Sequence, residues 1–245
     1  MSRIISYILI CLIMASLAVG ALATEATDHT DFIGQNSITN VTDNFVQESE
    51  IKLISIEREK LLDKIYEYTF IFQVGDGDFD KIGVHRVVKE SRPWCPVKTK
   101  AGVMMTPGNM MDFTTTYMIS TQTDAPGIEI NHSLAIYLAK ENIDVWGIDH
   151  RRSFVPDLYP GTDIPYCYAD LGNCSFMKDW DLSTQISDVR TAITFARVIR
   201  SSTRQGNDQM LILGASRGGR LAYAYANQET QLPSCERNLK GIITV

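Results

Sequence analysis

The stretch that most limits how this chain can fold lies at residues 210–224 and reads MLILGASRGGRLAYA. Its first part is an uninterrupted apolar run that is typical of a buried strand. A cluster of small residues follows, with Gly214, Gly218 and Gly219, and then a second apolar stretch with helical spacing. A buried strand that turns directly into a helix predicts an α/β domain, in which helices cover a mostly parallel sheet.

The rest of the chain supports this fold class. In IYEYTFIFQV (65–74) every second residue is apolar, as in a half-buried strand. Over 182–200 the apolar residues recur at steps of four and three, and Asp181 is the expected N-cap of that helix. Strands are expected at 65–74, 82–88, 101–106, 144–151, 209–214 and 241–245, and 51–56 can add a further strand to the meander; helices are expected at 132–143, 182–200 and 217–228. The order predicts an N-terminal β-meander that leads into a mostly parallel sheet flanked by helices, ending after about the sixth strand.

The N-terminus has the pattern of an export signal. Arg3 is followed by the uncharged run IISYILICLIMASLAVGALA, which ends in the small-x-small pattern of a cleavage site. We expect a signal peptide over 1–23, cleaved after Ala23, then a flexible polar leader over 24–48, and a protein that is secreted or extracytoplasmic. The alternative is an uncleaved anchor, because residues 4–23 are long enough to span a bilayer. The protein would then contact a membrane through this segment.

Charge and cysteine content restrict the partners. The net charge is −6 and the chain has no basic stripe, so nucleic acid is not an expected partner. An exported chain meets an oxidising compartment in which disulfides form. Cys167 and Cys174 lie close together in a loop-like stretch and are the expected disulfide pair. No histidine accompanies them at zinc spacing, so no metal site is expected.

The segment Gly214–Gly218 fits two chemistries. The first is dinucleotide binding, because GASRGG resembles the glycine motif T-G-x-x-x-G-x-G of the short-chain dehydrogenases. Arg220, however, stands where the third glycine of that motif permits close helix–strand packing. The motif also belongs to the first strand of its fold, whereas several strands come earlier here. An NAD(P)-binding loop is therefore a remote alternative, and no cofactor is expected.

The second chemistry is a serine nucleophile on a tight strand-to-helix turn, G-x-S-x-G. Such a turn exposes the hydroxyl of Ser216 above the sheet, and Gly214 and Gly218 let strand and helix approach closely. The helix N-terminus then presents backbone N–H groups to a developing oxyanion. A second donor is expected in the loop after the strand at 101–106, where Asn109 or Met110 offers its N–H.

From about residue 50 to its end, the chain resembles the N-terminal two-thirds of an α/β-hydrolase of the lipase and esterase kind. The meander, the Pro107-Gly108 loop, the strand end DVWGIDHRRS and the GASRGG turn occur in the order of that fold. The resemblance implies that Ser216 is the nucleophile and that the N–H groups of Arg217 and Asn109 hold the oxyanion. It also implies that residues 152–181, within an incomplete domain over 49–245, form a cap-like insert over the site.

In this fold the catalytic triad runs serine, acid, histidine along the chain. The acid and the histidine are therefore expected beyond Val245 in a full-length protein, and the 245-residue chain alone is expected to be an inactive fragment. The four histidines all precede Ser216. His150 follows a strand at the active-site edge, where a substrate contact or a structural role is expected. Trp180 either lines a pocket for the substrate or fixes an irregular loop.

The predicted function is a serine hydrolase that acts on small-molecule or lipid carboxylic esters through an acyl-enzyme on Ser216. The alternative is a catalytically inactive relative that binds a ligand or a protein partner. Two other patterns have structural interpretations. His85 is expected on a peripheral strand, and GDGDFDK (75–81) is expected to be a solvated hairpin turn.

Overall fold

One β-sheet organises the computed structural model, which describes residues 51–158, 161, 166–167, 174–206 and 209–245. Among these residues the sheet has eight strands, in the spatial order β1-β2-β3-β6-β5-β7-β8, and β4 pairs with β3 beside this path. The strands are β1 (Lys52–Leu62), β2 (Ile65–Gln73), β3 (Lys81–Arg92), β4 (Cys95–Pro96), β5 (Ala101–Thr106), β6 (Ile143–Asp149), β7 (Met210–Gly214) and β8 (Leu239–Thr244).

The sheet changes from antiparallel to parallel pairing across its width. β1, β2 and β3 form an antiparallel meander, and β6 joins β3 antiparallel. From there on β6, β5, β7 and β8 are parallel neighbours. Parallel neighbours need a long crossover connection, and each one here contains a helix. These helices are α3 (Leu134–Lys140), α4 (Leu182–Ser202) and α5 (Arg217–Thr230). The predicted fold class, a meander that leads into a parallel sheet flanked by helices, is confirmed.

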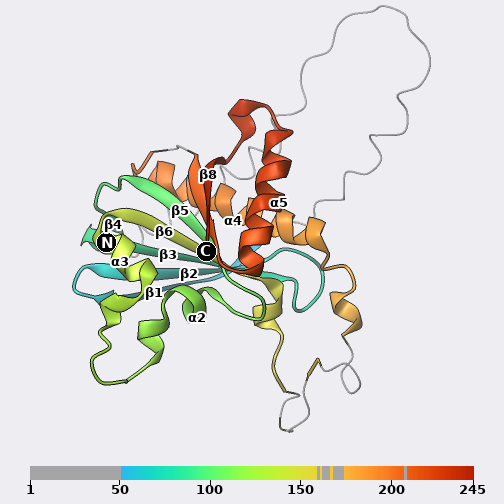
Figure 1. Cartoon of the computed structure of the whole chain (residues 1–245), viewed down its shortest axis with the longest axis horizontal. Helices are drawn as coiled ribbons and strands as arrows, with labels where there is room; N and C mark the ends of the chain where they lie inside the picture. Colours follow the sequence, from blue (N-terminus) through green and yellow to red (C-terminus); the bar gives the residue numbers. More distant parts are fainter. Residues whose placement is uncertain (1–50, 159–160, 162–165, 168–173, 207–208) are drawn as a thin grey trace, which may run out of the picture. The chain divides into compact units, whose positions relative to one another are not determined.

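Different helices cover the two faces of the sheet (Figure 1). The alternation along β6 shows how one strand supplies both cores. Val145 belongs to a core cluster with Ala135 and Ile136 of α3. The next residue, Trp146, points to the opposite face and meets the ring of Phe195 on α4 edge to face, with 6.2 Å between the centroids. All five side chains are buried, so the two-residue period of the strand fills two apolar layers.

A buried cluster of charges ties α4 to the antiparallel part of the sheet. Arg86 on β3 donates through Nε and Nη2 to the Asp144 carboxylate on β6, at 2.8 and 2.9 Å. Arg200 on α4 donates through Nη1 to the same carboxylate at 2.9 Å. All three side chains are buried. Gly102 leaves room for the cluster, because a Cβ there would lie 2.9 Å from the Arg200 guanidinium.

Some local predictions differ from the structure. The helix expected over 132–143 is shorter, because a 3₁₀ turn at Ile130–His132 comes first and α3 begins at Leu134. Helix α2 (Phe113–Tyr117) was not predicted, since five residues are too few to show a helical period. The expected signal peptide and leader, up to residue 48, lie outside the described residues. No helix within the described part of the chain is long and apolar enough to cross a bilayer.

Candidate active site

The turn between β7 and α5 holds Ser216 in a strained backbone conformation. Its φ is +53° and its ψ is −117°, a region that glycine adopts readily and that side chains with a Cβ avoid. Ser216 is exposed and immediately precedes the first residue of α5. Non-glycine residues are held in such conformations mainly at functional sites, where the surrounding structure enforces them.

The glycines on either side of Ser216 are required by close backbone contacts. A Cβ on Gly214 would lie 2.4 Å from the carbonyl oxygen of Gly218. A Cβ on Gly218 would lie 2.2 Å from the oxygen of Thr106 and 2.5 Å from that of Pro107. Real Cβ atoms do not approach backbone oxygens so closely, so a side chain at either position would push α5 away from β5 and β7. The two glycines therefore fix the height of Ser216 above the sheet.

Thr106, the last residue of β5, joins the turn to the neighbouring loop. Its carbonyl oxygen accepts from the backbone N–H of Ala215 at 3.2 Å and from the hydroxyl of Tyr117 at 2.7 Å. Its own hydroxyl donates to the carbonyl of Gly218 at 2.9 Å. Thr106 and Tyr117 are buried, and burial raises the pKa of the tyrosine, which keeps it a neutral donor. These bonds hold the turn at Ser216 against the end of β5.

The loop after β5 lies directly beside Ser216. A Cβ on Gly108 would be 3.6 Å from the Cβ of Ser216, which is ordinary contact. The next two residues, Asn109 and Met110, are exposed, and Met110 has a φ of +60°. Within the described residues, the backbone N–H groups of Asn109, Met110 and Arg217 donate to no protein acceptor. The predicted oxyanion donors are thus free to bind an oxygen, although their role stays a prediction.

The far end of this loop is anchored to β6. The backbone N–H of Phe113 donates to the Asp149 carboxylate at 2.7 Å. The Phe113 ring lies flat on the backbone of Gly147, where a Cβ would come within 2.0 Å of the ring. Asp112 caps α2 by accepting from the backbone N–H of Thr115. The loop that carries the candidate oxyanion donors is therefore fixed at both ends.

His85 is buried between two carboxylates, and the prediction that it lies on a peripheral strand is wrong. It occupies the interior strand β3, with Nδ1 2.8 Å from Glu67 and Nε2 2.9 Å from Asp149. Burial alone would lower the pKa of His85, but Asp149 and Glu67 outweigh burial and raise the pKa to about 10. The imidazolium is thus a structural cation that supports the same Asp149 carboxylate that holds the loop. Sequence spacing could not indicate it, because its partners lie on other strands.

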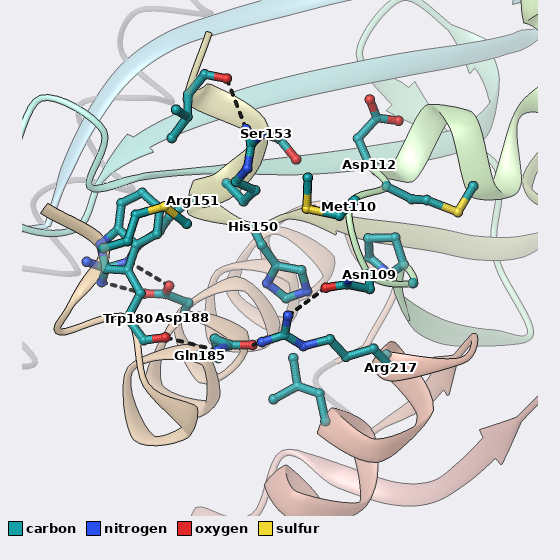
Figure 2. Close-up of a pocket in the computed structure, with 18 of the residues that line it drawn as sticks. Asn109, Met110, Asp112, His150, Arg151, Ser153, Trp180, Gln185, Asp188 and Arg217 are labelled. Atoms are coloured by element: carbon teal, nitrogen blue, oxygen red, sulfur yellow. Dashed lines mark hydrogen bonds and ion pairs between the residues drawn. The ribbon is translucent and has the colours of Figure 1, made fainter. Parts of the chain in front are cut away.

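A cavity of about 570 Å³ opens beside the turn at Ser216 (Figure 2). Gly108, Asn109 and Met110 of the β5 loop form one side, and Arg217 and Gly218 of α5 form another. Ser216 is not itself a lining residue, but Gly108 and Arg217 flank it. His150 and Trp180, the two predicted substrate contacts, both line the cavity.

His150 is the polar side chain of this cavity that is least satisfied. Its Nδ1 is buried and has no hydrogen-bond partner among the described residues. Burial lowers the pKa of His150 to about 4, against the opposing effect of Asp149 and with a further lowering from Arg217. The imidazole is therefore neutral at pH 7. Figure 2 shows it pointing toward the side chains of Asn109 and Arg217.

Trp180 is fixed by a network that starts in the β2–β3 hairpin. Its indole N–H donates to Asp80 at 2.7 Å, and the same carboxylate oxygen accepts from Arg151 at 2.6 Å. Arg151 also donates to Asp188 of α4 at 2.8 Å. Burial would raise the pKa of Asp80, but hydrogen bonds from Gly77, Trp180 and Arg151 outweigh it and lower the pKa. The turn at 75–81 is a hairpin as predicted, yet Asp80 is a packed anchor and not a solvated side chain.

The remaining candidates concern cysteines and metals. The structure joins Cys167 and Cys174 in a disulfide. Among the described residues, no three histidine, cysteine or acidic side chains lie close enough together to hold a metal ion. In the same part of the chain no histidine is hydrogen-bonded to Ser216. His85 is held by its carboxylates, and His150 lines the cavity without a partner for Nδ1.

Comparison with known proteins finds similarity in structure. No protein family matches the sequence, and no curated protein does. Among solved structures, the chain is similar to a Sulfolobus solfataricus protein assigned as a lipase, with a TM-score of 0.57 and 22% identity, over 80% of this chain and 49% of that one. Vibralactone cyclase gives a TM-score of 0.43 and 15% identity, over 74% of this chain and 42% of that one. An acetyl xylan esterase from Paenibacillus sp. R4 gives a TM-score of 0.39 and 16% identity, over 72% of this chain and 49% of that one. The chain thus spans about half the length of these proteins, and the first similarity identifies its fold.

Proposed function

We propose that this chain, which has the α/β-hydrolase fold, belongs to a serine hydrolase that cleaves carboxylic esters through an acyl-enzyme on Ser216. One observation carries the proposal. Ser216 has a φ of +53° at a strand-to-helix turn whose flanking glycines admit no Cβ. That combination is costly to maintain in an ordinary loop, and it presents a hydroxyl above the sheet beside free N–H donors.

The reaction follows from this arrangement. The Oγ of Ser216 attacks the ester carbonyl and loses its proton to a general base, and the alcohol leaves as the acyl-enzyme forms. The backbone N–H groups of Arg217 and of Asn109, with Met110 as the alternative, stabilise the oxyanion. Water then releases the acid and regenerates Ser216. In the chain order of this fold the acid and the base come after the nucleophile.

The cavity beside Ser216 is the proposed binding site for the substrate, a small-molecule or lipid ester. Trp180, Val155 and Leu221 supply apolar surface, and His150 supplies a polar contact. The insert at 152–181 contributes several lining residues, which supports its proposed role in substrate selection. We propose secretion after cleavage at Ala23. The apolar N-terminus and the disulfide in the structure both fit an exported protein.

A fluorophosphonate probe tests the proposal on the protein expressed from its complete reading frame. Such a probe reacts with an activated serine, so we expect covalent labelling at Ser216 and its loss in Ser216→Ala. Ser201→Ala, at an exposed position on α4, is the matched control and should label normally. Hydrolysis of p-nitrophenyl esters should follow the labelling. Absence of both would contradict the proposal and favour a catalytically inactive protein that binds a ligand or partner.

A further inference from the structure

Arg217 is a cation at the cavity whose protein partners are neutral. Its Nη1 donates to the amide oxygen of Asn109 at 2.7 Å, and its Nη2 donates to that of Gln185 at 3.1 Å. No carboxylate lies within ion-pair distance of Arg217 among the described residues. A guanidinium has five N–H groups, so three remain for a ligand. The two amides hold the guanidinium across the cavity, between the β5 loop and α4.

None of the three aspartates that line the cavity is paired with Arg217. Asp188 pairs with Arg151. Asp112 caps α2, and Asp157 is exposed on the insert. A second cation, Arg152, lines the wall, and its Nη1 donates to the backbone carbonyl of Val155 at 3.2 Å. The lining holds three arginines and three aspartates, so the positive charge is confined to the surroundings of Arg217 and Arg152.

His150 adds a second polar group of the cavity beside Arg217. The imidazole lines the cavity and points toward the Arg217 side chain, and its buried Nδ1 has no hydrogen-bond partner among the described residues. In the neutral ring one nitrogen donates and the other accepts. A planar anionic group between the two side chains would accept from the guanidinium and from the imidazole together.

We infer that the part of the cavity formed by His150 and Arg217 binds a carboxylate of the substrate. The preferred substrates are then esters that carry a free carboxylate besides the ester bond. This inference rests on the proposed function and names the substrate class for the same site. The two side chains that accept from Arg217 are neutral amides, so its charge is available to balance that of a carboxylate. A carboxylate also matches the planar guanidinium.

Matched pairs of esters test the inference on the protein from the complete reading frame. Monoethyl adipate and ethyl hexanoate differ by a carboxylate in place of a methyl group on the acyl side. 4-Acetoxybutanoate and butyl acetate differ in the same way on the alcohol side. We expect kcat/KM to favour the anionic member of at least one pair by about tenfold, the size of one charge-assisted hydrogen bond at an exposed arginine. Titration of the released acid at constant pH gives the hydrolysis rate of each ester in a pair.

Two variants distinguish an effect of the Arg217 guanidinium from a general effect of positive charge on α5. Arg217→Gln keeps the backbone N–H and should reduce the tenfold preference to near unity. Arg220→Gln removes an exposed arginine of α5 that does not line the cavity, and it should keep the preference. Hydrolysis without a preference, or a preference unchanged in Arg217→Gln, would overturn the inference while the proposed function stands.

A binding measurement tests the inference even if no ester is hydrolysed. Absence of hydrolysis would count against the proposed function and not against the inference. N-ethyl adipamate is an amide analogue with the carboxylate, and N-ethylhexanamide lacks it. In NMR spectra, the imidazole signals of His150, assigned with His150→Gln, should shift saturably with the first compound and not with the second. The pKa of His150 should also rise on binding, because the anion stabilises the imidazolium. An unchanged His150 signal would overturn the inference.

Discussion

Replacing Asp144 by asparagine should strongly destabilise the fold, because this carboxylate is the shared partner of two buried arginines. Asparagine keeps the size and one acceptor oxygen of the side chain but removes the negative charge. Arg86 and Arg200 would then remain buried, with exposed fractions of 3% and 1%, without a counter-charge. The substitution therefore tests whether charge pairing, and not mere packing, holds α4 against β3 and β6.

The size of the effect follows from the burial of the cluster. Removing one partner of a buried ion pair costs about 3–5 kcal/mol. Since Asp144 serves two guanidinium groups and is itself fully buried, we expect about 4 kcal/mol, near the middle of that range. The total free energy of unfolding of a domain is about 5–15 kcal/mol, so much of it would be lost. For a domain of this size the midpoint of thermal unfolding should fall by about 10 °C.

Urea unfolding followed by circular dichroism measures the change. Asp124→Asn, an identical substitution at an exposed loop position, is the matched control and should change the free energy of unfolding by less than about 0.5 kcal/mol. If Asp144→Asn unfolded at the same urea concentration as Asp124→Asn, the charge cluster would contribute nothing and the reasoning would be refuted.

Three further predictions concern the site and its supports. Gly218→Ala should cost about 3 kcal/mol and abolish fluorophosphonate labelling of Ser216, because its Cβ would meet backbone oxygens at 2.2 and 2.5 Å. Gly127→Ala is the control: Gly127 has a left-handed φ, and a Cβ added there would meet none of the described residues within 4 Å, so the substitution should cost about 1 kcal/mol and label normally. Gly147→Ala should slow labelling by displacing the Phe113 ring and the loop before it, and an unchanged labelling rate would show that the loop does not depend on this contact. The charged imidazole of His85 stabilises the fold fully below pH 6.5 and loses that contribution as the pH rises through its folded pKa of about 10. Over this interval the free energy of unfolding should fall by at most about 5 kcal/mol, and urea unfolding of His85→Gln at the same pH values should lack this decrease.

The order of the elements could be predicted from the sequence because it depends on local patterns. The alternation at 65–74 becomes β2, and the spacing of four and three residues becomes α4, capped by Asp181 as expected. Helix α2 could not be found in this way. It has five residues, and tertiary contacts such as the packing of Phe113 on Gly147 stabilise it in place of a periodic apolar face.

The candidate site also has a part that the sequence predicts and a part that it does not. The G-x-S-x-G spacing, with an apolar run before it and a helical pattern after it, located the turn, since all of these lie within one short stretch of sequence. The supports of that turn come from distant segments. Thr106 meets Gly218 across 112 positions, and His85 meets Asp149 across 64. No spacing rule links such residues, so their roles became visible only when the sheet brought them together.

The positive φ of Ser216 puts stability and activity in conflict at one residue. Glycine would relieve a conformation that costs about 1–3 kcal/mol, so the fold would tolerate heat better without its candidate nucleophile. A selection for thermal tolerance alone would therefore favour loss of the serine. Retention of a serine at φ +53° is what the proposed function requires.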